Sequence, residues 1–194
     1  MSYPWSERLI AGVIARQTLA SKCVVLVDNC NWTGHECDVL AVTTDLRIID
    51  VEVKISRADL KADAGKEKWW HRGGGWRAWA GETRPDPIAR DWPPRVWKHY
   101  YALPADIWRD DLIASLPSPK SGVLLLERQD SGTPVVVKCQ RRATPNKDAT
   151  RLSSANAMDI ARLANLRMWN AYSEAERFRR EVADMRSEIV MVAA

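Results

Sequence analysis

The sequence predicts an α/β (α+β) fold in which helices flank a central mixed β-sheet. Short apolar runs rich in β-branched residues recur between residues 23 and 139, and each has the length of a strand. Segments with apolar residues at helical spacing stand before, between and after these runs. At 194 residues the chain suits one domain with appendages. We therefore expect a domain over residues 1–150 and a helical extension over residues 151–194.

The first expected element is a helix that begins after Ser6, whose side chain can cap it. The apolar residues that recur at helical spacing are Leu9, Ile10, Val13 and Ile14. Glu7 falls in the first turn, where the helix dipole alone favours a carboxylate. A catalytic role for Glu7 is an equally open alternative. A buried strand is expected next, at residues 23–27.

Residues 36–54 are expected to form a β-hairpin. Side chains alternate along a strand, so Asp50, Glu52 and Lys54 share one face, and the apolar residues between them face the core. The hairpin brings Asp38 close to Glu52. Two close carboxylates resist joint ionisation unless a cation lies between them, and oxygen ligands of this kind suit Mg²⁺ or Mn²⁺. The hairpin therefore predicts a divalent-metal site, with a solvated strand face as the alternative. Asp50 could be a peripheral ligand of that site, but we favour a polar residue at the sheet edge.

These residues resemble the PD-(D/E)XK superfamily of phosphodiesterases: Asp38 matches the first acid, and Glu52-Val53-Lys54 matches the (D/E)XK tripeptide. Glu7 matches the helical glutamate found in many members. The segment 55–60, followed by Asp63, resembles the start of the next helix in small bacterial and phage proteins, including the MmcB-like DNA-repair group. The resemblance spans residues 6–68, with a looser match over residues 98–169. Cys37 stands where the pattern has proline, its most variable position.

The resemblance implies a restriction-endonuclease-like αβββαβ core and a metal-dependent nuclease. Asp38, Glu52 and the Val53 carbonyl would bind Mg²⁺ or Mn²⁺, and Glu7 would assist. Lys54 would orient the attacking water or offset charge on the phosphate. The expected substrate is DNA, in repair, recombination or phage DNA processing. The alternatives are a catalytically silent nucleic-acid-binding or assembly module on the same fold, and a protein-docking element of a larger complex.

A helix is expected from Ser56 or Asp59 to about Trp70, with its lysines facing outward. Its start lies beside the metal face, where backbone N–H groups suit phosphate contact. Arg57 could form an ion pair with Asp63 or contact a phosphate. Lys98 could contact DNA or lie in solvent at the entry to a strand. The residues expected to contact nucleic acid are Ser56, Arg57, Lys66, Lys68, Arg72, Arg77 and Lys98.

Residues 69–97 form an insertion rich in tryptophan, glycine and proline, which predicts an irregular segment. Between residues 64 and 98 eight Lys or Arg stand against four acids, a surplus equal to the net charge of +4 of the whole chain. That surplus suits a polyanionic partner. Tryptophans among arginines could stack on bases. The equal alternative is a lid pinned by tryptophans on the domain's own core.

Further strands are expected at residues 100–103, 122–126 and 134–139, with a short helix at residues 105–115. Apolar residues in steps of four and three from Ala161 to Ile189 predict a long helix with a coiled-coil-like seam. We expect its first half to pack on the domain through Leu163, Leu166, Trp169 and Tyr172. The second half is expected to pair with a copy of itself or with another protein, the alternative being a helix folded back on its own domain.

No signal-peptide pattern and no apolar run of about 18 residues is visible, so we expect a cytoplasmic protein with no membrane partner. The four cysteines are then expected to stay reduced. Cys30, His35 and Cys37 could share a zinc ion, but they lack paired C-x-x-C knuckles, and small buried thiols are favoured. His71 and His99 are expected to be surface or hydrogen-bonded residues, since hydrolysis at a metal needs neither.

Overall fold

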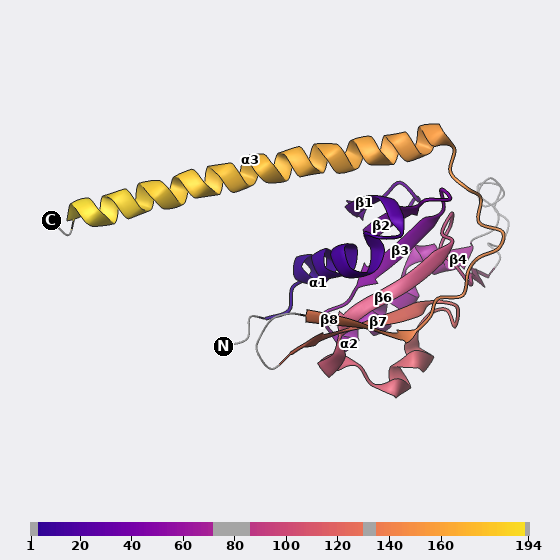
Figure 1. Cartoon of the computed structure of the whole chain (residues 1–194). Helices are drawn as coiled ribbons and strands as arrows, with labels where there is room; N and C mark the ends of the chain where they lie inside the picture. Colours follow the sequence, from indigo (N-terminus) through magenta and orange to yellow (C-terminus); the bar gives the residue numbers. More distant parts are fainter. Residues whose placement is uncertain (1–3, 72–85, 130–134, 193–194) are drawn as a thin grey trace, which may run out of the picture.

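A six-stranded mixed sheet forms the centre of the molecule, which confirms the predicted fold class (Figure 1). The computed structural model describes residues 4–71, 86–129 and 135–192, with side chains through Arg186. The strands lie in the order β1-β2-β3-β6-β7-β8. Their bounds are β1 Cys23–Cys30, β2 Cys37–Thr43, β3 Ile48–Val53, β6 Lys98–Pro104, β7 Gly122–Arg128 and β8 Val135–Arg141.

The sheet combines antiparallel and parallel pairing. β1, β2 and β3 are antiparallel neighbours, β3, β6 and β7 are parallel, and β8 returns antiparallel to β7. The parallel pairs need crossover connections, which carry the shorter helical elements. These are α2 Arg57–Ala62 and the 3₁₀ turns η2 Asp63–Gly65, η3 Glu67–Trp69, η5 Ala105–Ile107 and η6 Asp110–Ser115.

Two predicted helices are shorter than expected. The helix predicted to reach Trp70 ends at Ala62, because Gly65 is a poor helix former and Lys66 after it is extended, with φ −69° and ψ 140°. Two 3₁₀ turns replace its last part. The helix predicted over residues 105–115 is likewise two 3₁₀ turns, η5 and η6.

α1 (Glu7–Ile14) and the π-helical turn η1 (Ala15–Leu19) cover one face of the sheet. The Ser6 hydroxyl accepts the Leu9 N–H at 3.2 Å, so the predicted cap is present. The apolar side of α1 packs on alternate residues of β2 and β3, among them Val51 and Val53. The intervening residues Asp50 and Glu52 therefore leave the opposite face of β3, as the alternation predicted.

The opposite face carries two separate apolar clusters. Over β1 and β2, the start of α3 packs through Ala157 and Ile160. Over β6 and β7, Leu60 and Trp69 from the crossover after β3 pack with Leu112. β3 lies between β2 and β6 in the sheet, so its polar side chains emerge between the two clusters.

α3 (Ser154–Val192) is a helix of 39 residues whose C-terminal half extends away from the domain (Figure 1). Its contact with β1 ends near Arg167, whose guanidinium donates to the Asn29 carbonyl at 2.8 Å. The expectation that Leu166, Trp169 and Tyr172 pack on the domain is wrong: they are 47%, 63% and 60% exposed. β1 is the edge strand, so the sheet offers them no surface beyond it.

Pairing of the second half of α3 with a copy or another protein stays a prediction. Phe178 and Met185 of its seam are exposed within the single chain. Among the described residues, no helix combines the length and the apolar character that a membrane span requires.

Replacing Gly122 by alanine is expected to lower the free energy of unfolding by about 1–3 kcal/mol, because the new methyl group would overpack the start of β7. A Cβ at this position would lie 2.3 Å from the Tyr100 ring and 2.7 Å from the backbone nitrogen of Ala143. Gly65→Ala is the control, since a Cβ there meets no atom within 4 Å. Urea denaturation measures both variants, and equal stability would contradict the packing at Gly122.

Candidate functional site

Asp38 occupies the point where β2 parts from β3. The last pair in the register of the two strands is Val39 with Val51. The Lys54 N–H donates to Ala102 on β6, so the Val53 N–H before it points toward β2. There it donates to Asp38 Oδ2 at 2.6 Å. The Asp38 carboxylate thus closes the gap between the strands next to the expected tripeptide.

Asp38 and Glu52 are electrostatic neighbours, as the hairpin predicted. Burial and the charge of Glu52 raise the pKa of Asp38 to about 6, although the Val53 N–H and the ammonium groups of Lys54 and Lys66 oppose the shift. A carboxyl group with this pKa gains from a nearby cation.

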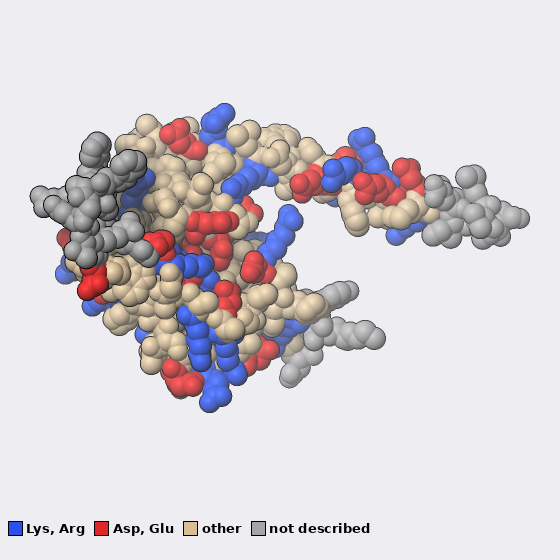
Figure 2. All heavy atoms as spheres, turned by 180° about the vertical axis from the view of Figure 1, so that it is seen from behind, with Lys and Arg blue, Asp and Glu red and all other residues tan. Residues whose placement is uncertain are grey.

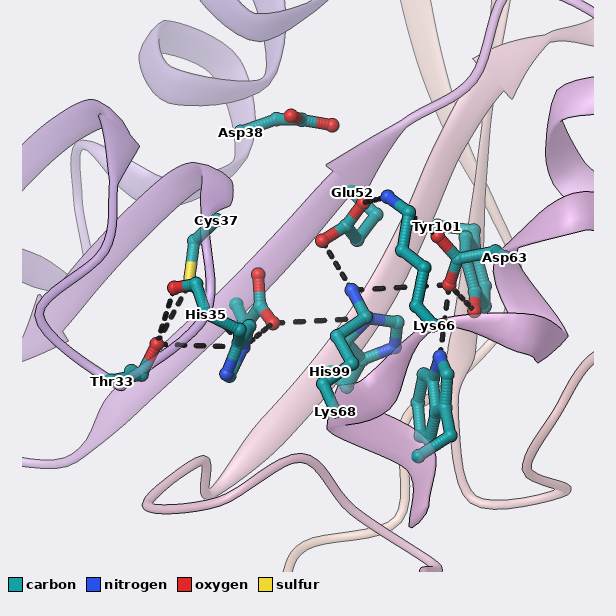
Figure 3. Close-up of polar contacts among 12 residues, drawn as sticks. Thr33, His35, Cys37, Asp38, Glu52, Asp63, Lys66, Lys68, His99 and Tyr101 are labelled. Atoms are coloured by element: carbon teal, nitrogen blue, oxygen red, sulfur yellow. Dashed lines mark hydrogen bonds and ion pairs between the residues drawn. The ribbon is translucent and has the colours of Figure 1, made fainter.

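Glu52 is buried and surrounded by three ammonium groups, as Figure 3 shows for Lys66 and Lys68. Glu52 Oε2 accepts from Lys54 Nζ at 3.2 Å and from Lys66 Nζ at 3.3 Å. Lys68 Nζ donates to the other oxygen, Oε1. A buried carboxylate requires such compensation, because burial alone makes its charged form costly.

Asp63 is a second buried acid of this cluster, and sequence reasoning did not place it there. Its Oδ1 lies 3.0 Å from both Lys54 Nζ and Lys66 Nζ, and its Oδ2 lies 3.8 Å from Lys68 Nζ. Tyr101 Oη also donates to Oδ2, at 2.6 Å. Burial alone would raise the pKa of Asp63, but Lys68 and Lys54 outweigh it and hold the pKa well below its usual range.

Lys54 is held as a cation. Burial alone would lower its pKa, but the carboxylates of Asp63 and Glu52 outweigh burial and keep the pKa above its usual value. The site therefore brings together Asp38, Glu52 and Lys54 of the predicted set. We define the lysine–carboxylate cluster as Glu52, Lys54, Asp63, Lys66 and Lys68.

The expectation that Lys68 faces outward is wrong, since only 2% of its side chain is exposed. The early end of α2 turns Lys68 and Trp69 inward, and Lys68 meets Glu52 in place of a phosphate. Lys66 is 49% exposed and is the lysine of the cluster that reaches solvent.

Other residues predicted to contact nucleic acid have partners within the domain. Ser56 Oγ caps α2 by accepting the Asp59 N–H at 3.1 Å. Arg57 Nε donates to the Ile107 carbonyl at 2.6 Å rather than to Asp63. Lys98 lies over the Trp97 ring, 4.3 Å from its centroid. Arg72 and Arg77 lie outside the described residues.

Figure 2 shows basic and acidic side chains interspersed on one side of the molecule, with several Lys and Arg side chains side by side in the lower part of the view. In the insertion, Trp69 is buried, Trp70 donates to the Ala64 carbonyl and Trp92 donates to the Thr144 carbonyl. These three tryptophans therefore pin the chain to its own domain. The short strands β4 Trp70–His71 and β5 Ile88–Ala89 pair at the base of the insertion, whose residues 72–85 lie outside the described residues.

Glu7 is exposed in the first turn of α1, the helix that covers the other face of the sheet. Within the described part of the chain, no hydrogen bond or ion pair joins Glu7 to Asp38 or Glu52. Its assistance to the site stays a prediction.

Asp50 lies on central strand β3 and is fully buried, so its placement at the sheet edge was wrong. Its Oδ2 lies 3.0 Å from His35 Nε2 and 3.9 Å from His99 Nε2. Burial alone would raise the pKa of Asp50, but the hydrogen bond from His35 and the charge of His99 lower it to about 2. His99 is hydrogen-bonded, as expected, through Nδ1 to Ser121 Oγ at 3.0 Å, and burial lowers its pKa to about 4.

Replacing Lys68 by methionine removes the ammonium group and keeps most of the stem. The free energy of unfolding should fall by about 3 kcal/mol, because Glu52 and Asp63 stay buried with one cation fewer. Lys61→Met on the exposed side of α2 is the matched control and should change it by less than about 0.5 kcal/mol. Guanidinium denaturation followed by tryptophan fluorescence measures both, and a Lys68 variant as stable as the control would refute the buried pairing.

The raised pKa of Asp38 predicts a pH-dependent stability difference between the wild type and Asp38→Asn. The folded-state pKa of about 6 exceeds the ordinary pKa of an aspartate, 3.8, so the folded state binds the proton more tightly. The contribution of Asp38 to the free energy of unfolding is therefore fully present at low pH and is lost as the pH rises from about 4 through 6. Asparagine stays neutral at every pH, and its side-chain oxygen can still accept the Val53 N–H.

Asp38→Asn should therefore match the wild type near pH 4 and exceed it by about 2 kcal/mol at pH 7.5. Urea denaturation of both proteins in metal-free buffer across this range provides the measurement. A difference that does not change with pH would contradict the assigned environment of Asp38.

No protein-family model matches the chain, and no curated protein matches it. Among solved structures it is similar to a protein of unknown function from Silicibacter pomeroyi, with 20% sequence identity and a TM-score of 0.52. The match covers 86% of this chain and 90% of that chain. At this identity the likeness shows a shared fold, a mixed sheet with helices over most of both chains.

Proposed function

We propose that the chain is a metal-dependent nuclease of the PD-(D/E)XK type that hydrolyses phosphodiester bonds, with DNA as the expected substrate. One observation carries the proposal. Two adjacent antiparallel strands bring Asp38 beside Glu52, and Lys54 Nζ lies 3.2 Å from Glu52. This is the donor set that the resemblance to PD-(D/E)XK enzymes requires at these residues.

The donor chemistry fits Mg²⁺ or Mn²⁺, which prefer carboxylate and carbonyl oxygens. Asp38 and Glu52 would hold the ion. The N–H and C=O of one strand residue point the same way, so we expect the Val53 carbonyl beside Asp38 as a third donor. The raised pKa of Asp38 supports a cation at this point. Glu52 must release a lysine to bind it, and the half-exposed Lys66 is the one able to withdraw.

A bound ion would polarise the scissile phosphate and lower the pKa of a bound water. Lys54 acts beside it as a fixed positive charge. Asp63 and Glu52 keep its pKa above the usual value, so it does not serve as a proton acceptor. Of the two roles expected for Lys54, offsetting charge on the phosphate is the one that its surroundings support. Asp63 positions Lys54 through a 3.0 Å contact.

The same cluster favours a second candidate, a catalytically silent nucleic-acid-binding or assembly module. Within the cluster, the two carboxylates of Glu52 and Asp63 face three ammonium groups, those of Lys54, Lys66 and Lys68. These ammonium groups compensate both carboxylates without a metal, and both oxygens of Glu52 already accept hydrogen bonds. In such a module the cluster would stabilise the domain and bind no ion.

Cleavage assays separate these candidates. Tag-free protein is incubated with plasmid, linear duplex, single-stranded and branched DNA, and with RNA, in Mg²⁺, Mn²⁺ or EDTA. We expect cleavage that EDTA abolishes and that falls by about 10²-fold or more in Asp38→Asn and Lys54→Ala, because each variant removes a charge that the reaction uses.

Asp159→Asn and Lys61→Ala change exposed residues of the same types whose side chains lie outside the cluster, and both variants should retain activity. Cleavage that persists in Asp38→Asn or Lys54→Ala would refute the site. Binding without cleavage by the wild type would favour the silent module.

A further inference from the structure

A second group of donor atoms lies beside the lysine–carboxylate cluster, at the entrance to β2. The loop between β1 and β2 carries Thr33 and His35, and Cys37 is the first residue of β2. Their polar atoms converge on one point, as Figure 3 shows. Asp50 reaches it from β3. His35 Nε2, Cys37 Sγ and an oxygen of Asp50 all lie within 4.8 Å of one another.

The spacing of these atoms matches that of ligands around one ion. Metal–ligand lengths of about 2.0 Å for nitrogen or oxygen and about 2.3 Å for sulfur place tetrahedral ligands about 3.3 Å (N to O) and about 3.5 Å (N to S) apart. Here His35 Nε2 lies 3.0 Å from Asp50 Oδ2 and 3.7 Å from Cys37 Sγ. Both distances from His35 Nε2 lie within a few tenths of an ångström of these values.

Buried atoms without partners give an independent sign of a missing ligand. Asp50 and His99 are completely buried, yet Asp50 Oδ1 and His99 Nε2 have no hydrogen-bond partner. Buried polar atoms are nearly always satisfied, and an ion or ordered water commonly accounts for the exceptions. His99 Nε2 lies 3.9 Å from Asp50 Oδ2, so this unpartnered nitrogen borders the same carboxylate.

We propose that His35 Nε2, Cys37 Sγ and the Asp50 carboxylate bind a divalent cation of the zinc type. Nitrogen and sulfur donors favour this borderline-soft class, whereas the all-oxygen set of Asp38 and Glu52 favours Mg²⁺. Three protein ligands leave a fourth position for water. Thr33 Oγ1 lies 3.5 Å from both His35 Nε2 and Cys37 Sγ and can hydrogen-bond that water.

The structure replaces one ligand of the zinc site considered from sequence. Cys30 is the cross-strand partner of Cys37, and both belong to the apolar cluster with Val27 and Leu40, but only Cys37 has its sulfur among the converging donor atoms. Asp50 takes its place among the donors. Burial and the charge of Asp50 hold the pKa of the Cys37 thiol above its usual range, so metal uptake releases its proton.

Cobalt(II) tests the site, because a Co²⁺–thiolate bond gives a charge-transfer absorption that oxygen ligands lack. Tag-free, full-length protein is stripped with a chelator under reducing conditions and titrated with Co²⁺, then with Zn²⁺. The expected result is one equivalent of Co²⁺ with the thiolate band, displaced by Zn²⁺. Zn²⁺ should also raise the melting temperature of the stripped protein, since it binds only the folded state.

Cys37→Ser should abolish the band, and His35→Gln should weaken Co²⁺ binding by about tenfold or more. Cys30→Ser is the matched control, because Cys30 is equally buried and directly opposite Cys37, and Cys139→Ser controls for an exposed thiol. Both controls should keep the band. Far-UV circular dichroism verifies folding, and the partly exposed His35 provides the second variant should Cys37→Ser not fold.

A band that is absent, that survives in Cys37→Ser or that disappears in Cys30→Ser would overturn the proposal. Asp38→Asn separates this site from the nuclease proposal. It should keep the Co²⁺ band even though cleavage is lost, and loss of the band in that variant would show that Co²⁺ occupies the Asp38–Glu52 position instead.

Discussion

The structure depends on the electrostatic compensation of buried acids in the middle of one sheet face. Glu52 and Asp63 are buried where β3 emerges between two apolar clusters, and each requires positive charge nearby. Lys54 comes from the end of β3, and Lys66 and Lys68 come from the chain after α2. The crossover from β3 to β6 is thereby fixed to the sheet by ion pairs as well as by apolar packing.

Much of the fold followed from periodicity. Alternation along β3 correctly separated Asp50, Glu52 and Lys54 from the valines under α1, and the hairpin brought Asp38 to Glu52. Periodicity did not predict the positions of Asp63 and Lys68, because these positions depend on where the helix after β3 ends. A helix that stops at Ala62 turns Lys68 toward Glu52, and helical spacing alone cannot show that change.

The local sequence also did not show where each strand lies in the sheet. Asp50 has the alternating pattern of an exposed strand, yet β3 is covered on both faces and Asp50 is buried beside His35 and His99. The strand that pairs on the far side of β3 begins 45 residues later, at Lys98. Likewise, the apolar residues of α3 indicated a packed helix, but the sheet ends at β1, before Trp169.

The length of α3 sets a distance scale. At about 1.5 Å per residue, its 39 residues span about 58 Å, more than the width of a small domain. Among its described side chains, those that contact the domain lie in the first turns, up to Arg167, so the far end would extend from this anchor like a spacer. A molecule bound at the far end would be held away from the polar centre of the sheet, and two chains joined at their tips would hold their sheets apart.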